Sequence, residues 1–267
     1  MGVSKTNKTY ASRYKTDLSV SQATNAGFDT TTRLICSGDG VDSSLSLSDD
    51  VLSVKPVNDN TTGTMLVKNN DGDNIFAVDT TNSKVLVGAS QVAANINMAY
   101  FGINSSDSAS LTANTHYPLP FQASAYSAAV LTTDFGTGTD PDDSFTTANT
   151  ATQFASQIVP MIWLLPHNIT ISSVTSVEGA DNATGDTTRM HLKSFDFTSG
   201  STSCLANGTL LAHNSDVTNA GNEQAYLSTW TVDSANVDAD KAILCFLRSD
   251  SVNSDYSITV NITYFVR

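Results

Sequence analysis

Charged residues and cysteines are scarce in this chain. Charged side chains make up 15% of its 267 residues, well below the ~25% of an average globular protein. The three cysteines, Cys36, Cys204 and Cys245, lack metal-ligand spacing and cannot all pair within one chain. Cys204 and Cys245 could form a disulfide across a sandwich. The simpler interpretation makes Cys245 a buried thiol, because it lies inside an apolar run.

Catalytic signals are missing as well. The chain contains no Gly-x-Ser-x-Gly, Walker loop or dinucleotide fingerprint. Its only glutamates are Glu178 and Glu223, which disfavours a glycan-cleaving enzyme with acidic residues gathered in one groove. The histidines show no metal-ligand spacing, and we expect turn or surface positions for His116, His167, His191 and His213. We predict that the chain is not an enzyme and has no catalytic, metal-binding or cofactor-binding residues.

Long apolar runs are also absent. The longest lies near residues 159–166, far short of the ~18 residues that a membrane span requires. The first ten residues are polar and contain no apolar h-region. We therefore predict neither membrane insertion nor a secretory signal.

The charge that is present is mostly negative and unevenly placed. The net charge is −13, which argues against sequence-independent binding of nucleic acid. Residues 1–33 nevertheless carry +3, so the rest of the chain carries −16. We interpret residues 1–34 as an extended arm that anchors the protein on an acidic partner different from that of the body. The candidate anchoring residues are Lys5, Lys8, Arg13 and Lys15.

Serine, threonine and asparagine supply most of the polarity and favour strands and turns over helices. Residues 64–88, TMLVKNNDGDNIFAVDTTNSKVLVG, hold three short apolar runs separated by two breaks rich in Asn, Asp or Thr. Residues 44–54 alternate leucine or valine with serine on both sides of an Asp-Asp turn. Both patterns predict short strands joined by turns. A few strands of this length cannot enclose a core by themselves.

Two phrases of the sequence carry a family resemblance. They are Leu-Ser-Leu-Ser-Asp-Asp-Val-Leu-Ser-Val and Asp-Gly-Asp-Asn-Ile-Phe-Ala-Val-Asp, the second followed by Lys-Val-Leu-Val-Gly. Residues 35–90 thereby resemble the shaft repeats of viral and phage fibres. The resemblance implies that repeats from three chains wind around one axis and bury their apolar rows together. The alternative is that the row packs on the chain's own C-terminal domain. The candidate trimer-core residues are Leu45, Leu47, Leu52, Val54, Leu66, Ile75, Phe76, Val78, Val85 and Val87.

We interpret residues 89–115 as a connector, which completes the region at 35–115. These residues are compatible with either a helix or a strand, and they end in a polar stretch that marks a domain boundary. Residues 116–267 then predict an antiparallel β-sandwich head of jelly-roll type, without helices. Within it, residues 160–166 are apolar between two prolines. They predict either a strand packed on both faces or a subunit contact made by Ile162, Trp163 and Leu164. The expected strands are 125–133, 153–165, 169–177, 187–197, 203–212, 223–232, 241–248 and 256–266.

The sequence thus predicts an all-β protein with an arm, a short β-repeat shaft and a sandwich head. We expect a homotrimeric bacteriophage fibre or spike on the external surface of the virion, bound to a capsid or tail protein. Its head would bind a glycan or protein of the host surface, or simply decorate the particle. The alternative function is a non-viral carbohydrate-binding adhesin or lectin module.

Overall fold

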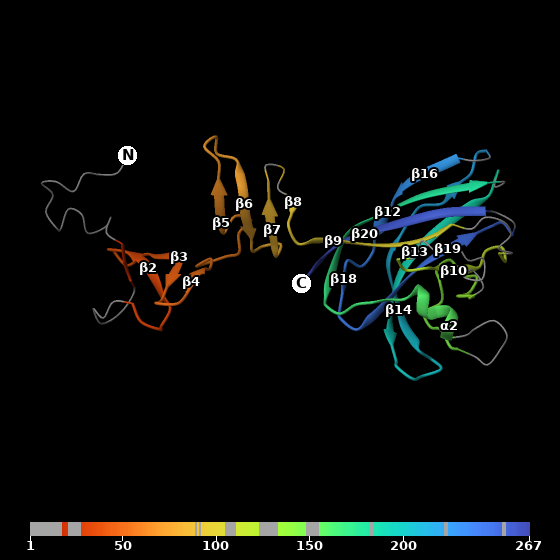
Figure 1. Ribbon diagram of the computed structural model, residues 1–267, viewed down its shortest axis with the longest axis horizontal. Helices are drawn as coiled ribbons and strands as arrows, with labels where there is room; N and C mark the ends of the chain where they lie inside the picture. The colour runs from red at the N-terminus through yellow and green to blue at the C-terminus, as the bar shows by residue number, and fades with distance from the viewer. Residues whose placement is uncertain are drawn as a thin grey trace, which may run out of the picture. The chain divides into compact units, whose positions relative to one another are not determined.

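The computed structural model describes residues 18–20, 28–88, 90, 92–104, 111–122, 133–147, 155–181, 184–221, 224–252 and 255–267. These residues fold almost wholly into antiparallel strands (Figure 1). The chain divides into two compact units, Met1–Asn95 and Ile96–Arg267. The predicted all-β class is confirmed. The division falls 20 residues before the expected boundary at 115/116.

The N-terminal unit contains two four-stranded sheets, each with its strands in sequence order. Successive strands pair because the segments between them are short and rich in turn-forming residues. Gly40 and Gly72, for example, adopt the positive φ values of 83° and 95° that glycine tolerates best. The first sheet comprises β1 (Leu18–Val20), β2 (Arg33–Ser37), β3 (Asp42–Leu47) and β4 (Leu52–Val54). The second comprises β5 (Met65–Lys68), β6 (Asn74–Asp79), β7 (Lys84–Val87) and β8 (Val92–Ala93).

The C-terminal unit is a sandwich of two antiparallel sheets. The seven-stranded sheet runs in the order β10 (His116–Leu119), β19 (Lys241–Ser249), β13 (Thr187–Phe197), β14 (Leu205–His213) and β17 (Thr231–Val232). It is extended by β11 (Trp163–Leu164) beside β19 and by β15 (Val217–Thr218) beside β13. The five-stranded sheet runs in the order β16 (Gln224–Thr229), β12 (Ile169–Asp181), β20 (Asp255–Val266) and β9 (Ile96–Asn104), with β18 (Asn236–Val237) beside β12.

Strand β9 corrects the expected role of residues 96–104. Its nine residues pair antiparallel with β20, from Ile96 opposite Phe265 to Asn104 opposite Ser257. This segment is therefore an edge strand of the sandwich and not part of a connector. Ala99, Phe101 and Ile103 are buried on its inner side.

The main core lies between the two sheets and includes alternate residues of β20 and β19. A second apolar cluster lies on the other side of the seven-stranded sheet, where Phe135, Phe145 and Met161 join Phe195 and Phe246. Strand β19 is consequently buried on both faces, which explains its nearly continuous apolar sequence. Its two faces lie in different clusters: Cys245 in the main core, Leu244 and Phe246 in the second.

The disulfide between Cys204 and Cys245 does not form, because the two residues belong to these different clusters. All three cysteines are free and buried. Burial raises the pKa of the Cys204 thiol as well as that of Cys245. Cys245 is accordingly the buried thiol that the simpler interpretation describes.

The predicted strand at 153–165 is wrong over most of its length. Its described part forms the short helix α2 (Ala155–Ile158), the 3₁₀ turn η3 (Val159–Met161) and only then β11. Pro160 occupies the first turn of η3, where a missing backbone N–H costs nothing. The expectation of a head without helices fails for the same reason. The expected strand at 125–133 lies mostly outside the described residues.

The apolar segment around Trp163 packs inside its own chain. Trp163 is 7% exposed, stacks on Phe121 at a ring distance of 5.6 Å and contacts Tyr264 at 5.0 Å. Ile162 packs against the second cluster, while Leu164 is 52% exposed. Trp163 is therefore covered within its own chain. The alternative of a strand packed on both faces is wrong, because Leu164 is exposed, and a subunit contact through Ile162 and Leu164 stays a prediction.

Candidate functional site

The apolar residues of the N-terminal unit are the first candidate site, and the first sheet arranges them as the sequence predicted. Leu45 pairs with Val54 and Leu47 pairs with Leu52 across β3 and β4. Cross-strand partners share a face, so these four side chains form one apolar row. Leu52 is 65% exposed, and the other three are only half-buried.

The second sheet carries apolar side chains on both of its faces. The pairs Met65–Val78, Val67–Phe76, Phe76–Val87 and Val78–Val85 define one face. Leu66, Ala77 and Leu86 pair on the other face, which Ile75 shares by alternation. The candidate trimer-core residues of this sheet therefore do not form a single row. The sequence could not reveal this, because an uninterrupted apolar run has no polar positions to mark its faces.

None of the ten candidate trimer-core residues is buried within the chain. Among the described residues of the N-terminal unit, only Cys36, Ala77 and Asp79 are buried. Both core clusters consist entirely of residues from the C-terminal unit. The two N-terminal sheets thus have regular strands and apolar faces without an enclosed core of their own.

The candidate anchoring residues Lys5, Lys8, Arg13 and Lys15 lie outside the described residues. A neighbouring cation is described: the Arg33 guanidinium lies 2.5 Å from the Asp29 carboxylate. This pair holds the pKa of Asp29 well below its ordinary value, and a backbone hydrogen bond from Thr31 adds to the effect. Arg33 is therefore already paired within the chain.

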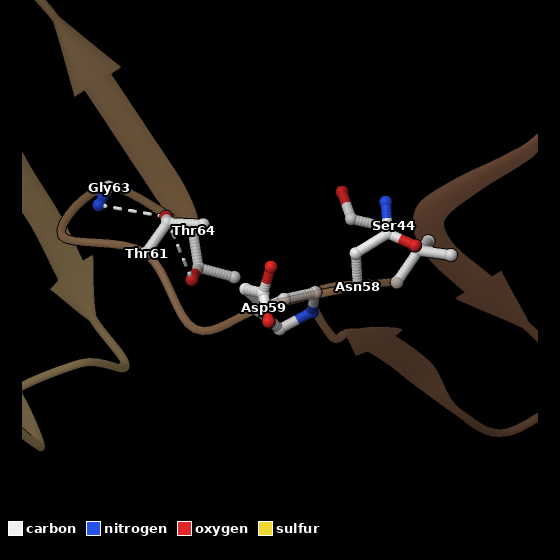
Figure 2. Close-up of a pocket in the computed structure, with 8 residues that line it drawn as sticks. Ser44, Asn58, Asp59, Thr61, Gly63 and Thr64 are labelled. Atoms are coloured by element: carbon white, nitrogen blue, oxygen red, sulfur yellow. Dashed lines mark hydrogen bonds between the residues drawn. The ribbon is translucent and has the colours of Figure 1, made fainter.

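A groove of about 440 Å³ opens beside the segment that joins the two N-terminal sheets (Figure 2). Its lining combines short polar side chains with Pro56 and Val57 and includes no aromatic ring and no cation. The Thr61 hydroxyl accepts a hydrogen bond from the Gly63 backbone N–H and contacts the Thr64 hydroxyl. These contacts hold the segment in its turn, and the groove offers neither a stacking platform nor a charged group other than Asp59.

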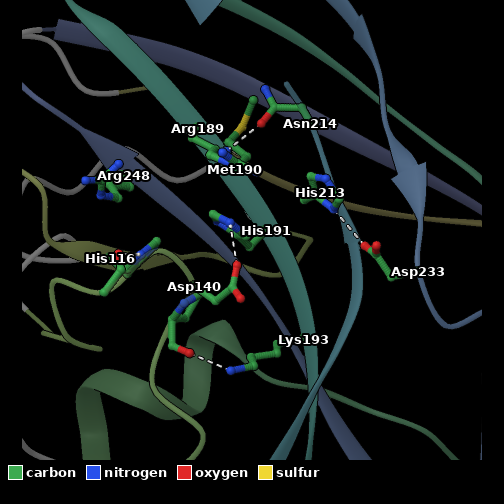
Figure 3. A network of polar contacts seen from close by, with 12 residues as sticks. His116, Asp140, Arg189, Met190, His191, Lys193, His213, Asn214, Asp233 and Arg248 are labelled. Atoms are coloured by element: carbon green, nitrogen blue, oxygen red, sulfur yellow. Dashed lines mark hydrogen bonds and ion pairs between the residues drawn. The ribbon is translucent and has the colours of Figure 1, made fainter. Parts of the chain in front are cut away.

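Three histidines meet on the outer side of the seven-stranded sheet, where the sequence showed no motif (Figure 3). The rings of His116 and His191 lie 5.1 Å apart, and those of His191 and His213 lie 6.4 Å apart. His116 and His191 are fully buried, so the expectation of turn or surface positions is wrong for both. It holds for His167, which is exposed. Strands β10, β13 and β14 bring the three together, and a spacing of 22 residues or more gives no local signal.

Burial lowers the pKa of two of these histidines, His191 and His116, and so favours their neutral form. It lowers the pKa of His191 to about 3, with a further contribution from nearby His116. Nε2 of His191 lies 3.4 Å from the Asp140 carboxylate, a contact without hydrogen-bond geometry. Burial also lowers the pKa of His116, although its Nε2 lies 3.1 Å from the Gly138 carbonyl oxygen. Nδ1 of His213 lies 2.7 Å from the Asp233 carboxylate.

The segment with Asp140, Asp142 and Asp143 lies beside a polar groove of about 340 Å³. Lys193 reaches into it, and its Nζ donates to the Pro141 carbonyl oxygen and to the Asp143 carboxylate. Burial raises the pKa of Asp142, and the charge of Asp134 raises it further. Within the part of the chain that the structure describes, no group of three or more His, Cys, Asp or Glu side chains is arranged to hold a metal ion. Lys193 and the histidines instead fix this acidic segment to the sheet.

A scan against protein-family models found no match to this chain, and a search of curated proteins found no similar sequence. No helix in the described ranges is long and apolar enough to span a membrane. Function therefore has to be argued from the two apolar sheets and from the surfaces of the sandwich.

Proposed function

We propose that this chain is a virion structural protein, a homotrimeric bacteriophage fibre or spike. The observation that carries the proposal is the set of ten apolar residues that a single chain leaves unburied. Their exposure contrasts with the C-terminal unit, which encloses two apolar clusters. A unit with regular strands but no core needs other chains to complete it.

The energetics favour repeated association of identical sheets. Each Å² of apolar surface removed from water contributes about 25 cal/mol. In a cyclic trimer, each of the three chains would bury these residues, and the association would also cover free strand edges. A sheet with apolar side chains on both faces suits an intertwined shaft, since such a sheet has neighbours on two sides. This is what the resemblance to fibre shaft repeats implies.

The proposed shaft also suggests roles for the arm and for the sandwich. The arm at residues 1–34 would anchor the protein on the capsid or tail through Lys5, Lys8, Arg13 and Lys15. The acidic sandwich would be the exposed head, which decorates the particle or binds the host surface. The net charge of +3 on residues 1–33 against −16 on the rest supports different partners for the two ends.

The proposal is tested by the mass of the purified protein in solution. Light scattering should give three times the 28.2 kDa of one chain. A monodisperse monomer would remove the basis of the proposal. Deletion of residues 1–34 should leave a folded trimer that no longer joins the particle, and unchanged incorporation would refute the anchoring role.

A further inference from the structure

The outer face of the five-stranded sheet is uncharged across the middle of four strands, up to the pair Asp181–Asp255 where β12 ends and β20 begins. We define this uncharged face by the outward residues of β9, β20, β12 and β16, which lie opposite one another in register. One cross-strand row runs Tyr100, Asn261, Thr175 and Thr229. Its other members are Ile96, Met98, Gly102, Ser257, Thr259, Thr263, Ser173, Val177, Gly179, Ala225 and Leu227.

The one acidic residue in the middle of these strands points inward. Glu178 is 4% exposed and accepts a hydrogen bond from the Thr188 hydroxyl on the opposite sheet. Inward residues of β20 and β9 are likewise buried, which fixes the orientation of their outward neighbours. The residues that define the uncharged face thus include no carboxylate and no cation, in a chain whose net charge is −13.

Large apolar side chains stand exposed on this face. Leu227 is 76% exposed, Met98 is 68% exposed and Val177 is 47% exposed. Tyr100 and Ile96 add further apolar area on the edge strand, at 42% and 40%. Exposed apolar residues gathered on one sheet face, between short uncharged polar ones, are typical of an interaction surface.

The outer face of the seven-stranded sheet is built in the opposite way. Helix α2, η3 and the segment around Phe135 and Phe145 bury part of it in the second cluster. Its remaining surface carries ion pairs such as Lys193–Asp143 and Arg189–Asp216. The chain thus covers one sheet of the sandwich by itself and leaves the other uncovered.

We infer that the uncharged face is the contact between heads, with two further copies of this chain as its occupants. The inference rests on the proposed function and names the head surface that the trimer uses. Copies with a charge of −13 repel one another wherever acidic surfaces meet. A face without charge is where copies approach without burying an unpaired carboxylate. Serine, threonine and asparagine on it can hydrogen-bond to their own counterparts across the contact.

Met98 and Asn261 allow a test on the full-length chain. Hydrogen peroxide oxidises Met98 more slowly when the face is covered. Peptide mass spectrometry measures this oxidation rate. Asn261→Asp places a carboxylate at the centre of the face with almost no change in shape. Asn168→Asp is the matched control, because Asn168 is exposed off this face and its Oδ1 accepts the Ala239 backbone N–H. An aspartate oxygen can accept the same bond.

We expect Met98 to oxidise at least tenfold more slowly in the wild type and in Asn168→Asp than in Asn261→Asp. Met161 and Met190 are at most 1% exposed, so their slow oxidation in every variant confirms that the head remains folded. Masses by light scattering accompany each measurement. Thr175→Asp, at the cross-strand partner of Asn261, repeats the test if the first variant fails to fold.

The outcomes separate this inference from the proposed function. A wild-type trimer in which Met98 oxidises as fast as in Asn261→Asp overturns the inference and leaves the fibre proposal standing. Slow oxidation of Met98 in both the wild type and Asn261→Asp also overturns the inference, since the added charge would then not disturb the contact. A wild-type monomer overturns the fibre proposal, and protection of Met98 in that monomer would assign the covering to the chain's own N-terminal unit.

Discussion

The two units of this chain have similar strand sequences, but only the C-terminal unit encloses a core. Both consist of antiparallel strands that mix serine with valine and leucine. The C-terminal unit stacks two sheets and fully buries residues such as Val260 and Phe246. The N-terminal unit leaves Leu52 and Val67 65% and 48% exposed. Strand-forming propensity is therefore shared between the units, and only the closure of a core distinguishes them.

This difference indicates which contacts stabilise each unit. A closed sandwich draws its free energy of folding from contacts within one chain. On the proposed function, an open sheet with two apolar faces draws its free energy of folding from other chains, and its stability would then depend on protein concentration. The predictions below test this contrast, beginning with the largest expected effect.

The largest effect should follow a charge on an apolar face of the second N-terminal sheet. Val78 pairs with both Met65 and Val85, and Val78→Asp would bury a carboxylate in each chain of the trimer. We expect the protein concentration needed for association to rise at least about 100-fold, equivalent to ~3 kcal/mol. Analytical ultracentrifugation measures this. Thr81→Asp, in the exposed turn before β7, should leave association intact; equal loss in both variants would contradict the assignment.

The next effect should be confined to the C-terminal unit. Phe246 is fully buried against Phe135 and Phe195, and Phe246→Ala should lower the free energy of unfolding by about 3–5 kcal/mol. Both tryptophans, Trp163 and Trp230, lie in the main core of this unit. Their fluorescence during urea titration therefore reports this unit alone. An unchanged midpoint would show that the second cluster contributes little.

A smaller effect should appear on acidification. His191 has a pKa of about 3 in the folded chain against about 6.5 when unfolded. Below pH 6.5 the unfolded state therefore binds more protons, and stability falls as the pH drops toward 3. We expect the protonation linked to His191 to lower the free energy of unfolding by about 2 kcal/mol between pH 7 and pH 5. His191→Gln should remove that slope, whereas exposed His167→Gln should keep it. Identical slopes in all three proteins would exclude His191 as the source.

The smallest effect should come from Leu164, which is 52% exposed next to buried Trp163. Leu164→Ser should change the free energy of unfolding by less than about 0.5 kcal/mol. Trp163→Ala, one residue away, should cost about 3–5 kcal/mol. Urea denaturation followed by circular dichroism measures both. A large loss for Leu164→Ser would mean that this side chain is covered in the assembled protein.

A nearly continuous apolar run predicted β19, and alternating polarity predicted β20. The expected strand at 187–197 matches β13, and those at 241–248 and 256–266 differ from β19 and β20 by one residue. Residues 96–104 show where this signal fails. Ile96, Met98 and Tyr100 suggested an apolar strand face, yet Ala99, Phe101 and Ile103 are the buried ones. Both sets are apolar, so only pairing with β20 decides which faces the core.

The histidine cluster could not be predicted for a different reason. His116, His191 and His213 lie on three strands, and only the strand order of the seven-stranded sheet brings them together. Such long-range pairings leave no local spacing in a single sequence. The apolar row of the first N-terminal sheet was predictable because its leucines and valines alternate with serines over a few consecutive residues. The two faces of the second sheet were not, because its apolar runs are uninterrupted.

The pairing of β9 with β20 also sets where a reporter or display domain could be attached. Ile96, the first residue of the C-terminal unit, lies opposite Phe265, two residues before Arg267. A domain fused after Arg267 would thus begin next to Ile96, the first residue of the C-terminal unit. The other end of this strand pair, at Asn104 and Ser257, lies a strand length away. Fusion after Arg267 should therefore leave that end of the sandwich unobstructed.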